Sequence, residues 1–239
     1  MGGRIYWCML FGILSIACSC VLNHHDQSES IGHKSPLTNI IQLNSGVLEL
    51  SEDHFTSISF KRIPPNQIEF KEDSIVFQVR ESASFLLYPF GSVKKINQLR
   101  FDWKSKGEFN VLSAKHEATK KGDDARIRPG LILKSKADFI DLFGTPEWIR
   151  KSAEVLNHPA DRIVFLLPGA FHEPGTSWKN PYSPKVDMIS IPSTDLSDGW
   201  KQSEFLFEIP LETVGFMIMA DGDNTHSSFS SEIKNLHID

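Results

Sequence analysis

The 239-residue chain has very little cysteine, and what it has lies at one end. Cys8, Cys18 and Cys20 are the three, all within the first twenty residues. A fold built from the rest of the chain therefore contains no disulfide, so a hydrophobic core has to supply its stability. A chain of this length can bury a hydrophobic core large enough to stabilise a fold without disulfides.

The chain also lacks an excess of positive charge. It has 25 Lys and Arg against 30 Asp and Glu, a formal net charge of −5 and a pI near 6.0. A non-specific phosphate binder needs a basic face, so we expect no nucleic-acid partner. Hydrophobic residues make up 40 % of the sequence, which excludes disorder of the whole chain.

Several catalytic motifs are missing as well. The sequence contains no Gly-x-Ser-x-Gly nucleophile elbow, no P-loop, no Gly-x-Gly-x-x-Gly and no His-Glu-x-x-His. These absences weaken the case for a hydrolase, a nucleotide-binding enzyme or a zinc protease. They do not exclude a catalytic site that arose by convergence and lacks these motifs. Whether the protein is an enzyme is thus uncertain, and a role without catalysis is favoured.

The first residues have the features of a bacterial lipoprotein signal. Arg4 precedes an apolar run over 5–22, and Leu14-Ser15-Ile16-Ala17-Cys18 resembles a lipobox. We expect lipidation at Cys18, with Cys20 as a second acceptor. A plain signal peptide and an uncleaved anchor are the alternatives, since the run is barely long enough to span a bilayer.

Cleavage before Cys18 would divide the chain into a signal peptide over 1–17, a flexible tether over 18–37 and a β-sandwich domain over 38–239. Ser19 follows the predicted acceptor where inner-membrane retention typically uses Asp, so we expect the outer membrane, with the domain facing the periplasm or the cell surface. The lipid anchor would supply the contact with the membrane.

Short β-rich runs separated by turn residues dominate the predicted domain. Apolar side chains alternate along 98–103, and the run 214–220 is apolar throughout, which indicates a strand buried on both faces. One helix is expected, with Thr145 as its N-cap and Pro146 in its first turn. A single helix among many strands, without a βαβ rhythm, predicts an all-β fold of the jelly-roll or galactose-binding-like sandwich type.

Three aromatic residues lie in or beside predicted loops. Trp178 and Tyr182 belong to a Pro- and Gly-rich stretch over 168–184, which we expect to be a long loop, and Trp200 follows farther along. Exposed aromatic rings can stack on the apolar face of a pyranose. The alternative is that these rings pack over the edge of the sandwich.

Oxygen-bearing side chains follow the predicted buried strand. Asp221, Asp223, Asn224 and Thr225 are hard-cation ligand types in a short segment, so a calcium site is one interpretation. An EF-hand is excluded because His226 stands where that loop needs glycine. The favoured alternative is a turn whose short side chains bond to the backbone.

A second polar group consists of Asp123, Asp124 and Arg128. If their strand adjoins the one that ends at Asp221, an ion pair between Arg128 and a carboxylate would fix the loop geometry. In the functional alternative, the carboxylates accept sugar hydroxyls or act as acid and base.

Four segments together resemble the bacterial domain-of-unknown-function 3047 family. They are Gly122-Asp123-Asp124 with Arg128, the strand 99–103, the loop 175–182 with Met188-Ile189, and the segment 214–225 with Glu232-Ile233. The resemblance covers roughly residues 55–239 and implies a secreted galactose-binding-like sandwich, with no established activity. Pro129 and Gly130 depart from the family pattern, which predicts an edge or a bulge there.

The sequence therefore predicts a lipid-anchored envelope protein whose sandwich binds a carbohydrate without catalysis. The expected ligand-binding residues are Trp178, Tyr182, Trp200, Asp123, Asp124 and Arg128. The expected partner is a cell-envelope glycan. The alternatives are an envelope protein as partner, with a structural or interaction role, and an enzyme acting on polysaccharide.

Overall fold

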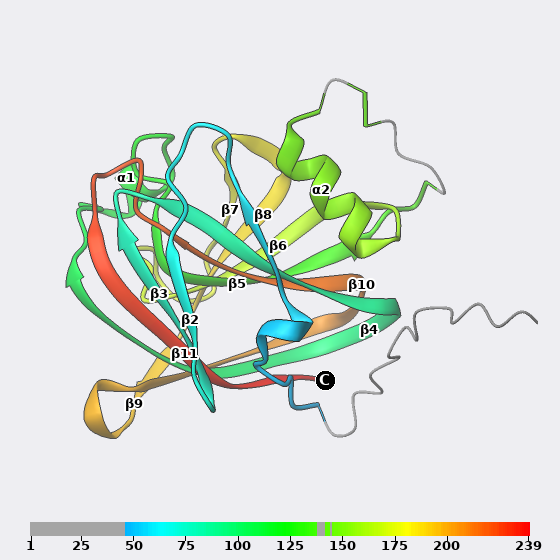
Figure 1. Ribbon diagram of the computed structural model, residues 1–239. Coiled ribbons are helices and arrows are strands. Elements are labelled where there is room, and N and C mark those ends of the chain that lie inside the picture. Colours follow the sequence, from blue (N-terminus) through cyan, green and yellow to red (C-terminus); the bar gives the residue numbers. More distant parts are fainter. Residues whose placement is uncertain (1–45, 138–141, 144) are drawn as a thin grey trace, which may run out of the picture. The chain divides into compact units, whose positions relative to one another are not determined.

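The structure is a computed structural model that describes residues 46–137, 142–143 and 145–239 (Figure 1). The predicted signal peptide, the tether with Cys18, and the start of the predicted domain lie outside the described residues. The remainder confirms an all-β fold with few helices. Its strands are β1 (Thr56–Ser59), β2 (Gln67–Phe70), β3 (Ser74–Arg80), β4 (Ala83–Glu108), β5 (Ala125–Lys134), β6 (Ala160–Pro168), β7 (Ser177–Asn180), β8 (Ser183–Ile191), β9 (Ser193–Asp195), β10 (Lys201–Asp221) and β11 (Ser228–Ile238).

Two long strands connect the two layers of the sandwich. The hydrogen-bonded order is β2-β3-β11-β4-β10-β5-β6-β8-β7, while β1 pairs with β4 and β9 with β10. The first part of β4 pairs with β1 and with the end of β10, and its last part pairs with β11 and the start of β10. Register shifts along β10, between Leu206 and Leu211 and between Thr213 and Gly215, mark the bends.

The main core lies between the layers. β3 and β11 contribute side chains such as Phe77 and Ile233 from one layer, and β5 and β10 contribute others such as Leu131 and Phe216 from the other. Phe101 on β4 is also fully buried, as its alternating pattern predicts. The core therefore follows the period-two pattern of the sequence.

The run 214–220, predicted to be a strand buried on both faces, is buried on both faces as part of β10. Phe216 and Ile218 of β10 join the main core, whereas Met217 and Met219 join a second apolar cluster on the opposite face of the sheet. Met219 is followed two residues later by Asp221, which lies on that same outer face because side chains alternate along a strand. The second cluster thus borders the polar residues at the end of β10.

Helix α2 (Glu147–Leu156) covers this second cluster (Figure 1). Trp148 packs edge-on against Phe85 of β4, with ring centroids 6.0 Å apart. The helix is the one that the sequence predicts, but its N-cap is Pro146, and the Thr145 hydroxyl donates instead to the Leu142 carbonyl. Proline already holds the extended cap geometry, so the expected threonine cap is not formed. Elsewhere, α1 (Ala114–Glu117) is a single turn before β5.

Two further expectations need correction. The stretch 168–184 is not one long loop, because it contains β7, which pairs with β8. Pro129 and Gly130 lie within β5 between two neighbours, with Pro129 opposite Ile218 of β10. The pairing with β6 begins only at Gly130, so Pro129 stands just beyond the last rung with β6. In the described part of the chain, none of the helices has the length and apolar character needed to cross a bilayer.

Candidate functional site

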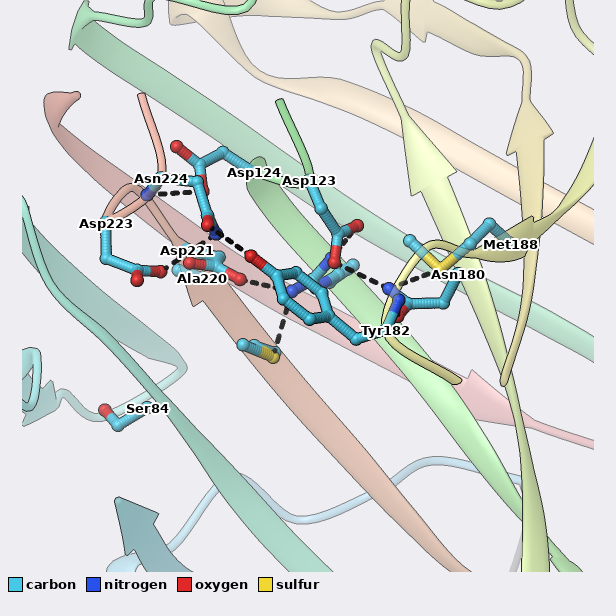
Figure 2. A network of polar contacts seen from close by, with 12 residues as sticks. Ser84, Asp123, Asp124, Asn180, Tyr182, Met188, Ala220, Asp221, Asp223 and Asn224 are labelled. Atoms are coloured by element: carbon cyan, nitrogen blue, oxygen red, sulfur yellow. Dashed lines mark hydrogen bonds and ion pairs between the residues drawn. The ribbon is translucent and has the colours of Figure 1, made fainter. Parts of the chain in front are cut away.

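Three loops meet where β10 ends and β5 begins. They are 122–124 before β5, 222–227 between β10 and β11, and 180–182 between β7 and β8 (Figure 2). Gly122 closes the first loop against α1, since a Cβ there would lie 2.3 Å from the His116 carbonyl oxygen. The strand pairing of Arg128 with Met219 brings the two predicted polar groups together.

Arg128 is the centre of the resulting network. Its side chain is 4 % exposed, and its Nη1 donates to Asp123 Oδ1 at 3.2 Å while Nη2 donates to Asp221 Oδ2. The guanidinium also lies 5.2 Å from the centroid of the Phe165 ring. The ion pair that the sequence offered as one interpretation of these residues is thus present, and the guanidinium joins two carboxyl groups rather than one.

Neither of these carboxyl groups has its usual pKa. Burial raises the pKa of Asp221 well above the ordinary aspartate value, and Asp223 and Asp124 reinforce this effect against the opposing charge of Arg128. Burial also raises the pKa of Asp123, although Arg128 and Asn180 oppose that shift. One guanidinium therefore does not fully compensate the negative charge that surrounds it.

Asp124 holds the turn after β10. Its Oδ1 accepts from the backbone N–H and the side-chain amide of Asn224, both at 3.2 Å. Its Oδ2 accepts from the backbone N–H of Thr225 at 2.7 Å and from the Thr225 hydroxyl. Asn224 and Thr225, predicted as turn residues or metal ligands, thus act here as donors to a carboxylate. Asp223 and Asp221 keep carboxylate oxygens close to Asp124.

Tyr182 lies over this network with an exposed ring. The residue is 56 % exposed, and its hydroxyl lies 2.7 Å from Asn224 Oδ1 and 2.9 Å from the Lys120 carbonyl oxygen. The Lys120 ammonium lies 5.2 Å from the ring centroid. Partial burial raises the pKa of Tyr182, and the nearby carboxylates add to the shift, with Asp123 the largest contributor among them. The hydroxyl thus stays protonated and fixes the ring from one end.

The two tryptophans lie outside the network. Trp178 on β7 is half-buried and stacks on His172, with ring centroids 4.1 Å apart, and it packs on the second apolar cluster. Trp200 precedes β10 at the end farthest along the strand from Asp221, where Lys104 and Lys234 lie 4.2 and 4.3 Å from its ring centroid. Trp178, Tyr182 and Trp200, which the sequence suggests as one set of ligand-binding aromatic residues, therefore lie at three separate places in the fold.

Sequence reasoning missed Asn180 as a site residue. Its Nδ2 donates to Asp123 Oδ2 at 2.6 Å, and its Oδ1 accepts from the Tyr182 backbone N–H. The Asn-Pro-Tyr order is a turn signal that could have placed Asn180 beside Tyr182. Its contact with Asp123 depends on a pairing between distant segments.

A small cavity lies apart from this network, with a volume of about 240 Å³. Trp103, His172, Ser190 and Lys201 are among its lining residues. Glu117 reaches His172 Nδ1 at 2.7 Å and also accepts from the backbone N–H groups of Phe171 and His172. These bonds hold the backbone that forms one wall.

No family model matches the sequence, and no curated protein matches it either. Among solved structures, the chain is similar to a "Carbohydrate binding module family29" chain, with a TM-score of 0.31 and 12 % sequence identity. The match covers 77 % of this chain and 87 % of that one.

Proposed function

We propose that this protein is a lipid-anchored envelope protein whose β-sandwich binds a cell-envelope glycan without catalysis. The observation that carries the proposal is the exposed ring of Tyr182, held over a polar network whose rim is partly open to solvent. Figure 2 draws this ring in front of the carboxylates and amides that surround it.

The arrangement suits a carbohydrate because a sugar has both an apolar face and a polar edge. The ring of Tyr182 offers a flat surface whose orientation is fixed at its hydroxyl. Asn180, Asp223 and Asn224 are partly exposed around it and carry amide and carboxylate groups that can bond to hydroxyls. A flat ring beside a few oriented polar groups is the usual composition of a sugar site.

The bonding of the buried carboxylates favours binding over catalysis. Asp123 and Asp221 are ion-paired to Arg128, and Asp124 accepts four bonds from the turn at 224–225. All three are at most 5 % exposed. A general acid or base has to reach a substrate proton directly or through one water, which these engagements hinder.

A glycan array tests the proposal with the purified full chain and two aromatic variants. We expect a defined set of envelope glycans to bind, and Tyr182→Ala to weaken binding by roughly tenfold, the upper end of what one aromatic contact contributes. Trp200→Ala is the matched control and should bind as the unchanged protein does.

Two outcomes would contradict this function. One is the absence of any glycan binding, which would move attention to an envelope protein as the partner. The other is equal binding by Tyr182→Ala and the unchanged chain, which would remove Tyr182 from the site.

A further inference from the structure

Three carboxyl groups lie close together beneath Tyr182. Asp124, Asp221 and Asp223 each offer one oxygen, and these three oxygens lie within 4.8 Å of one another. Asp124 comes from the loop before β5, Asp221 is the last residue of β10, and Asp223 lies in the turn that follows. Asp124 and Asp221 are buried, whereas Asp223 is partly exposed.

One oxygen of this group lacks a partner. Asp221 is 3 % exposed, and among the described residues no donor reaches its Oδ1, although Oδ2 is bonded to Arg128. Figure 2 shows the Asp221 carboxylate beside that of Asp223. A buried carboxylate oxygen without a donor is costly, because it has lost water and gained nothing in return.

The charges around this oxygen are unbalanced. The network contains the carboxyl groups of Asp123, Asp124, Asp221 and Asp223. Arg128 is the cation paired with them in the described part of the chain. The other groups that face them, from Asn180, Tyr182, Asn224 and Thr225, are neutral. Four carboxyl groups thus share one guanidinium, and a divalent cation would supply the positive charge that lets them ionise together.

We propose that Asp124, Asp221 and Asp223 bind one calcium ion, which ties the loop 122–124 to the turn after β10. Calcium takes six to eight oxygen ligands and accepts irregular geometry, so three carboxylates with water completing the shell suit it. Asp124 would contribute an oxygen that also accepts from the turn at 224–225, and this shared oxygen is what would join the ion to that turn. The partial exposure of Asp223 gives the ion and its waters a path from solvent. Asp223 belongs to both this site and the proposed glycan site, but calcium binding by the three carboxylates does not require a glycan.

Isothermal titration of the full chain, stripped with chelator and then titrated with calcium chloride, tests the site without any sugar present. We expect one ion per chain with a Kd between about 0.1 and 1 mM, the range of extracellular calcium modules. Asp223→Asn should weaken binding at least tenfold. Asp187→Asn removes a carboxylate that pairs with Arg162 and Lys179 and does not belong to the three-carboxylate group, and it should leave the Kd unchanged.

Thermal unfolding provides the second measurement. Calcium should raise the melting temperature of the unchanged chain and of Asp187→Asn, but not that of Asp223→Asn. Asp223→Ser replaces Asp223→Asn if circular dichroism finds the latter misfolded. Absence of binding heat and of any melting shift up to about 10 mM calcium would overturn the proposal, as would equal affinity in the Asp223 variants.

Discussion

At the scale of single residues, the network depends on one buried cation. Arg128 holds Asp123 and Asp221, whose positions are set by two different segments, and its Nε has no hydrogen-bond partner among the described residues. Its guanidinium thus contributes through its charge and through the two bonds of its Nη atoms, at a place where water cannot substitute for it. Removing one partner of such a group leaves an uncompensated buried charge.

We therefore expect Arg128→Met to lower the free energy of unfolding by about 3–5 kcal/mol, as measured by urea denaturation. Arg126→Met on the same strand is the matched control. Arg126 is only partly buried and packs over Phe109, so its loss should cost about 1 kcal/mol or less. A similar small loss for Arg128→Met would mean that Asp123 and Asp221 are both protonated in the folded protein.

The sequence predicted which residue types form this network but not how they pair. Arg128 and Asp221 lie 93 residues apart, and their contact follows from the register that places Arg128 opposite Met219. Spacing along the chain carries no information on such a register. Trp178 illustrates the same limit, since its stacking on His172 depends on β7 pairing with β8.

At the scale of elements, two continuous strands replace four predicted ones. The sequence suggests separate strands over 82–88 and 98–103, which β4 joins, and over 204–209 and 214–220, which β10 joins. Gly91 and Pro210, residue types that often end strands, lie between these runs. The chain bends at these places without leaving the sheet, because bulges absorb the change in register. Ile209 alternates with the buried Phe207 along the sequence, yet it is 74 % exposed at such a bend.

Strand β11 is linked to both of its neighbours by Glu232. Its carboxylate accepts from Ser74 of β3 at 2.7 Å, from Lys104 of β4 at 2.9 Å and from Lys71 at 3.2 Å. Burial alone would raise the pKa of Glu232, but these three donors outweigh it and lower the pKa from 4.5 to about 2. A carboxyl with a lowered folded-state pKa stabilises the fold above its unfolded value and loses that contribution as the pH falls.

We expect Glu232→Gln to lower the free energy of unfolding near pH 7 by about 1–2 kcal/mol, a figure reduced because both lysines are more than a third exposed. The difference from the unchanged chain should be full above about pH 4.5 and vanish near pH 2. Urea denaturation across this range measures it. Glu147→Gln, in an exposed helix pair with Lys151, is the matched control and should leave the free energy of unfolding essentially unchanged at every pH. A loss for Glu232→Gln that does not vary with pH would contradict the ion-pair origin.

At the scale of the whole molecule, composition and alternation were enough to predict an all-β fold with few helices. They could not predict how the layers connect, because the sharing of β4 and β10 between layers is a property of long-range pairing. The site lies where this connectivity brings strand ends together. The sequence could therefore identify candidate residues of the site, but it could not show which of them lie next to one another. The lipid anchor belongs to this scale too, and it stays a prediction from residues 1–20.

The anchor prediction is tested by labelling with palmitate in a bacterial host. We expect the unchanged chain to incorporate label and to fractionate with the outer membrane. Cys18→Ala should abolish both label and cleavage, because the lipidated cysteine is also the residue that directs processing. Cys20→Ala is the matched control and should behave as the unchanged chain does. Loss of label in Cys20→Ala alone would move the acceptor to Cys20, whereas a released and unlabelled chain would indicate plain secretion. In either labelled case, more than one acyl chain is needed, since a single chain binds a bilayer only weakly and reversibly.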